Sequence, residues 1–73
     1  MKIIAATEAQ AIKMVELFND YSEMDLAPVG REIEVDMVEL DMLIDALAFN
    51  GYDLDVIDTL DTALEMNANI ALL

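Results

Sequence analysis

The sequence predicts an all-α or mostly α fold, a small three-helix domain in which the helix spanning residues 36–50 is central. Apolar residues recur at helical spacing in three stretches, about 8–22, 36–50 and about 54–67. A capping residue lies at or just before the start of each stretch, and Gly51 follows the second. With 73 residues and no cysteine, the chain is expected to form one domain, 1–73, stabilised by its 58% apolar residues or by association.

The central stretch 36–50 carries the clearest helix signals. Asp36 and Glu39 have the spacing of a capping box, and Asn50-Gly51 is a helix stop. One side of this helix would hold Met37, Leu40, Leu43, Ile44 and Leu47, and nearly the opposite side Val38, Met42, Ala46 and Phe49. A helix that is apolar nearly all round is usually buried, so it should lie between other helices of its own chain, a second copy or a partner.

The flanking helices are ordinary amphipathic ones. Thr7 and Gln10 form a capping-box signature for the first helix, and either Asp53 or Asp55 can cap the third. The expected inward face of the first helix is Ala11, Met14, Val15, Leu17, Phe18 and Tyr21. That of the third is Val56, Ile57, Leu60, Ala63 and Leu64.

Two short stretches could be strands. Residues 2–5 are apolar apart from Lys2, and residues 31–35 alternate polar and apolar, so the two could pair as a minor two-stranded ribbon. An extended loop fits them equally well. The apolar tail, residues 70–73, is expected either to enter the core or to meet a partner.

Charge narrows the function. Sixteen acidic residues oppose only Lys2, Lys13 and Arg31, giving a net charge of −13, and no base occurs from Glu32 onward. Direct binding to nucleic acid is therefore excluded, anionic membranes are disfavoured and a basic protein partner is favoured. Neither a signal peptide nor a run of about 20 apolar residues is present, so a cytoplasmic location is expected.

Catalysis is not expected. The chain has no His and no Cys, which removes the commonest general base and the strongest nucleophile. An EF-hand loop starting at Asp53 would place Asp58 where glycine is required and Leu64 where glutamate is required. We therefore predict no catalytic residue, no cofactor and no metal site.

Acidic residues on the third helix form the candidate binding site. Asp53, Asp55, Asp58, Asp61 and Glu65 would span roughly 18 Å at the helical rise, or about one carboxylate per 4 Å. Phosphates of one DNA strand follow each other at about 3.4 Å along the axis. The central helix adds a second row, Asp41 and Asp45.

These seven carboxylates predict a mimic of nucleic acid. In size, charge and lack of reactive groups the chain resembles the small acidic nucleic-acid mimics that bacteriophages and mobile elements direct against restriction, repair or CRISPR enzymes. That resemblance implies stoichiometric inhibition through occupation of a basic, nucleic-acid-binding surface on an enzyme. The alternative is an adaptor or oligomer subunit, such as a homodimer, that binds through the apolar set Val38, Met42, Ala46 and Phe49.

Overall fold

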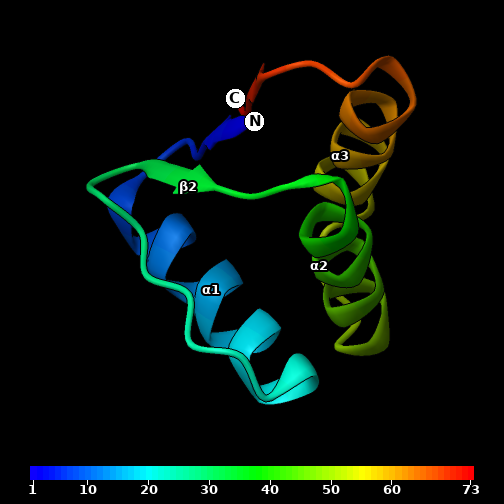
Figure 1. The fold of residues 1–73 in the computed structure, drawn as a ribbon. Helices are drawn as coiled ribbons and strands as arrows, with labels where there is room; N and C mark the ends of the chain where they lie inside the picture. The colour runs from blue at the N-terminus through cyan, green and yellow to red at the C-terminus, as the bar shows by residue number, and fades with distance from the viewer.

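The fold is mostly α-helical with a small sheet at one end, as the sequence predicts. A computed structural model describes residues 1–73 (Figure 1). The elements in chain order are β1 (Lys2–Ile4), α1 (Glu8–Ser22), β2 (Glu32–Glu34), α2 (Met37–Phe49), α3 (Leu54–Met66) and β3 (Ile70–Ala71). None of the three helices combines the length and the apolar content that a membrane span requires.

The sheet has three strands in the order β2-β1-β3. β1 and β2 are antiparallel, with Ile3 opposite Ile33, so of the two alternatives for residues 2–5 and 31–35 the structure has the paired strands and not the extended loop. The third strand was not predicted. β3 lies parallel to β1, and the Leu72 backbone N–H donates to the Ile4 carbonyl at 2.7 Å. Two residues are too few to show the alternation by which a strand is recognised.

The sheet buries one face only. Ile3 and Ile33 are fully buried, whereas Lys2, Glu32 and Glu34 are exposed, because successive side chains in a strand point to opposite faces. Across the open face, Lys2 Nζ lies 3.8 Å from Glu32 Oε2, at a diagonal position of the ladder. The helices lie against the other face (Figure 1).

The helix ends follow the capping signals. The Asp36 side chain accepts from the Glu39 backbone N–H, and the Glu39 side chain accepts in return from the Asp36 N–H, which completes the predicted capping box. At α1 the Thr7 hydroxyl oxygen accepts from the Gln10 N–H at 3.0 Å. Gln10 reaches back one residue further than the motif predicts, because its Oε1 accepts from the Ala6 N–H.

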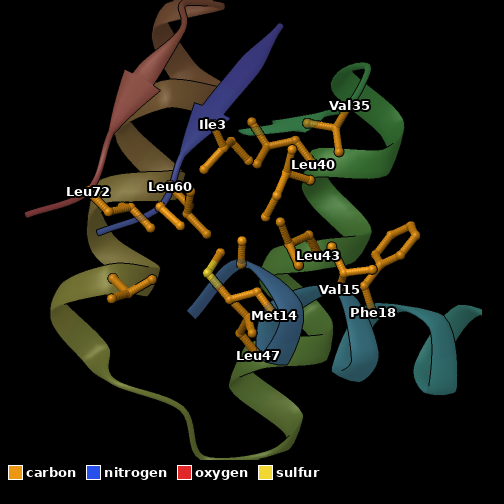
Figure 2. Packing of buried hydrophobic residues seen from close by; sticks show 14 of the residues in the cluster. Ile3, Met14, Val15, Phe18, Val35, Leu40, Leu43, Leu47, Leu60 and Leu72 are labelled. Atoms are coloured by element: carbon orange, nitrogen blue, oxygen red, sulfur yellow. The ribbon is translucent and has the colours of Figure 1, made fainter. Parts of the chain in front are cut away.

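Helix α2 is the central element, since it packs against both α1 and α3. α2 and α3 form a helical hairpin around the turn 50–53, where Gly51 adopts a φ of 65° that only glycine tolerates easily. The core side chains of α2, among them Leu40, Leu43 and Leu47, pack against residues of the other helices and of the sheet (Figure 2). The core cluster is Ile3, Ala5, Ala11, Met14, Val15, Phe18, Ile33, Val35, Leu40, Leu43, Leu47, Val56, Leu60, Ala63 and Leu72.

Two residues expected to face inward are substantially exposed. Tyr21, in the last turn of α1, is 46% exposed, and Met37, the first residue of α2, is 39% exposed. Both lie in a terminal turn of their helix, where fewer neighbouring residues cover a side chain than in the middle of the helix. The Tyr21 ring instead lies against the Phe49 ring of α2.

The tail 70–73 enters the core, so Leu72 and Leu73 make a matched pair of test positions. Leu72 is 4% exposed and packs in the main cluster, whereas Leu73 is fully exposed. We expect Leu72→Ala to lower the free energy of unfolding by about 2–3 kcal/mol through lost burial and a residual cavity. Leu73→Ala should change it by less than about 0.5 kcal/mol. Urea denaturation followed by circular dichroism measures both, and equal effects would contradict the docking of β3.

Candidate acidic interface

The hairpin of α2 and α3 carries all seven carboxylates of the predicted binding site, and every one of them is exposed. Asp41 and Asp45 project from α2. Asp53 lies in the turn, and Asp55, Asp58, Asp61 and Glu65 follow along α3. The two rows therefore run along the two arms of one hairpin.

The row on α3 is set by which side of that helix is buried. Val56, Leu60 and Ala63 form the core side. At about 100° per residue, Asp58, Asp61 and Glu65 fall within about 60° of one another on the opposite side. The spacing i, i+3, i+7 thus produces a straight exposed row of three carboxylates.

Asp53 and Asp55 belong to the start of α3 and lie at the edge of that row. Asp53 is the N-cap, and its Oδ1 accepts from the Asp55 backbone N–H at 2.8 Å. Both carboxylates are near the positive end of the helix dipole, which stabilises them there. One oxygen of Asp53 is thus engaged by the fold, while its other oxygen makes no hydrogen bond within the chain.

Basic residues lie elsewhere in the molecule. The one salt bridge joins Lys2 to Glu32 on the sheet. Arg31 Nε donates to the Ala5 carbonyl at 2.8 Å, and Lys13 is exposed on α1. No carboxylate of the hairpin has a cationic partner in the chain, so these groups repel one another and are open to an external cation.

The carboxylates do not converge on a point. No group of three or more acidic side chains is close enough to hold a metal ion. A depression of about 370 Å³ lies between the start of α3 and the last residues, and it is lined by Asp53, Asp55, Val56, Thr59, Ala71, Leu72 and Leu73. Two polar side chains that line this depression form hydrogen bonds within α3: Asp53 caps the helix, and the Thr59 hydroxyl donates to the Asp55 carbonyl.

The four residues of the alternative apolar interface lie in different environments. Val38 and Phe49 are 68% and 79% exposed, but Ala46 is fully buried and Met42 is half-buried against the core. They consequently do not form one continuous exposed face. The largest exposed apolar side chains on this side of α2 are Val38 and Phe49, which lie on either side of Asp41 and Asp45 along the chain.

Two exposed apolar side chains that lie near the turn 50–53 of the hairpin were not identified from the sequence. Leu54 is 73% exposed and precedes Asp58 by one helical turn, on the same side as the acidic row. Tyr21 lies against Phe49, with ring centroids 5.8 Å apart and the ring planes tilted by 48°. The spacing from Leu54 to Asp58 signals the first, but nothing in the sequence indicates the contact between α1 and α2 that brings Tyr21 there.

Comparisons with protein-family models, with curated proteins and with solved structures gave no match. A function for this chain is therefore inferred from its own structure. Its main features are an acidic hairpin with no internal cation and an apolar group at the turn end of that hairpin.

Mutual repulsion on the hairpin predicts a protein that salt stabilises. We expect the urea midpoint to rise between about 0.01 M and about 1 M NaCl, as the Debye length falls from about 30 Å to about 3 Å. The variant Asp58→Asn, Asp61→Asn, Glu65→Gln removes two like-charge pairs, each costing about 0.2–0.5 kcal/mol. It should be more stable than the wild type at low salt and respond less to salt, and an unchanged salt response would contradict the repulsion.

Proposed function

We propose that this protein is a stoichiometric inhibitor that mimics nucleic acid and occupies the basic nucleic-acid-binding surface of an enzyme, of the anti-restriction, anti-CRISPR or repair-inhibitor type. The observation that carries the proposal is the exposure of all seven predicted carboxylates on one helical hairpin that contains no base. The inhibitor would act by occupancy alone, without turnover, cofactor or metal.

The amount and distribution of charge support this function over simple solubility. A small domain needs a net charge of only about 2–8 in magnitude to stay in solution, usually with both signs interspersed. Here the net charge is −13, and the three bases lie in the first 31 residues. Keeping unpaired acids on two packed helices lowers the stability of the fold, and a basic partner would relieve that cost.

The spacing of the carboxylates suits a surface built for phosphates. Along the straight part of α3, from Asp58 to Glu65, three carboxylates are distributed over roughly 10 Å of helix. Phosphates of one DNA strand follow each other at about 3.4 Å along the axis, so the α3 row presents negative charge at a lower but similar linear density. The row on α2 adds Asp41 and Asp45 on the neighbouring arm of the hairpin.

A second candidate, an adaptor that binds a protein partner through apolar contacts, is favoured by the exposure of Val38 and Phe49. Salt separates the two functions. Complexes held by exposed charge weaken steeply as salt rises, whereas apolar complexes do not. A partner captured from bacterial lysate that elutes early in a salt gradient and is displaced by added DNA supports the mimic, and one that survives high salt and ignores DNA supports the adaptor.

Charge reversal on α3 tests the proposed function directly. We expect Asp58→Lys, Asp61→Lys, Glu65→Lys to weaken binding to the captured enzyme by at least about tenfold, because like charges facing each other across an interface cost several kcal/mol. Affinity is measured by isothermal titration calorimetry, and far-UV circular dichroism checks that helicity is retained.

The matched control changes net charge by the same amount on another surface. Glu16, Asp20 and Asp25 are exposed on α1 and in the loop that follows it. Replacing these three by lysine should reduce affinity much less than replacing the α3 row. Equal losses from the two triple variants would mean that net charge alone drives binding, and an unchanged affinity of the α3 variant would remove the row as the site.

A further inference from the structure

The turn end of the hairpin presents an aromatic pair to solvent. Phe49, the last residue of α2, is 79% exposed, although its ring lies 5.8 Å from that of Tyr21. Tyr21 itself is 46% exposed. Most of the Phe49 side chain is thus free to contact another molecule, and its contact within the fold is with Tyr21.

A carboxylate lies next to this ring. Asp45 precedes Phe49 by four residues, so the two side chains are neighbours on one helix face, with Cβ atoms about 5–6 Å apart. Asp45 is exposed, and the only salt bridge of the chain is elsewhere. The second acid of α2, Asp41, continues the same face one turn further away.

A ring and a carboxylate at this spacing suit a guanidinium group. Arginine is planar, stacks on aromatic faces and can donate two parallel hydrogen bonds to one carboxylate. The lysine ammonium is a compact, strongly hydrated charge that stacks less well on a ring and cannot make the two parallel hydrogen bonds to a carboxylate. The pairing of Phe49 with Asp45 therefore favours arginine over lysine.

Charge decides where that arginine comes from. A second copy of the chain also carries −13, so pairing two of these faces would bring Asp41 and Asp45 toward the same residues of the other copy. The chain's only arginine, Arg31, donates to the Ala5 carbonyl. The complementary occupant is a basic protein.

We propose that Tyr21, Asp45 and Phe49 form a docking site for an arginine side chain of the basic partner. This inference rests on the proposed function and adds to it a specific anchor. The carboxylate rows attract any basic surface, whereas the docking site selects surfaces that present arginine at the turn end of the hairpin. Val38, at the other end of the exposed face of α2, takes no part.

Two synthetic peptides of equal length and charge test the site, one with arginine and one with lysine at every basic position. Their dissociation constants are measured by fluorescence anisotropy with the full chain. The wild type should bind the arginine peptide more tightly, and Phe49→Leu should lower that preference about two- to five-fold, as expected for one exposed cation–π contact. Phe49→Tyr should keep the preference, because it retains an aromatic ring.

Val38→Ala is the matched control, since it also shortens an exposed apolar side chain of α2. It should leave the preference unchanged. The site is overturned if Phe49→Leu keeps the wild-type preference, or if Val38→Ala reduces the preference as much. Thermal unfolding of each variant verifies that the fold is intact, as expected for substitutions at exposed positions.

The two proposals fail in different ways. If every variant keeps the arginine preference and the α3 lysine variant binds both peptides weakly, there is no docking site and binding is driven by charge alone. A Phe49-dependent arginine preference in a chain that captures no nucleic-acid-binding enzyme removes the mimicry and leaves the docking site.

Discussion

Burial of α2 on two sides is the constraint on which the rest of the structure depends. The helix packs against α1 and against α3, and its leucines supply the middle of the core. A chain of this size can bury only about 60% of the surface that it exposes when unfolded. Placing the most apolar helix between the other two is how so small a domain obtains a continuous core without disulfides, and that arrangement leaves each helix with one strip for solvent.

Those strips explain how the molecule accommodates its charge. Every buried side chain is apolar, and the acids of the three helices lie on the sides that the core does not use. The basic residues stay on β1, on α1 and before β2, so they do not neutralise the hairpin. The fold thus separates the signs in space, with the open sheet face holding the single ion pair and the hairpin holding unpaired negative charge.

Much of this could be predicted from the sequence because the signals are local. The capping residues Thr7 and Asp36 and the Gly51 stop place the starts of α1 and α2 and the end of α2 to within a residue, and helical spacing places the acids on exposed sides. The alternation around Ile33 made the pairing of β1 with β2 one of two possibilities, and the other was an extended loop. What the sequence did not indicate depends on tertiary contacts. β3 is defined by its hydrogen bonds to β1. Ala46 is buried, although the sequence allowed its side of α2 to be an exposed interface. Tyr21 contacts Phe49 only because α1 and α2 pack together.

The parallel pairing of β1 with β3 has a consequence for folding kinetics. The Lys2 backbone N–H donates to the Asn69 side chain, so this contact closes a loop that contains nearly the whole chain. The α2–α3 hairpin, in contrast, needs only the closure of a four-residue turn. Loop-closure entropy rises with loop length, and long-range pairing slows folding. Loop-closure entropy therefore favours formation of the acidic hairpin before the pairing of β3 with β1, which brings the most distant segments of the chain together.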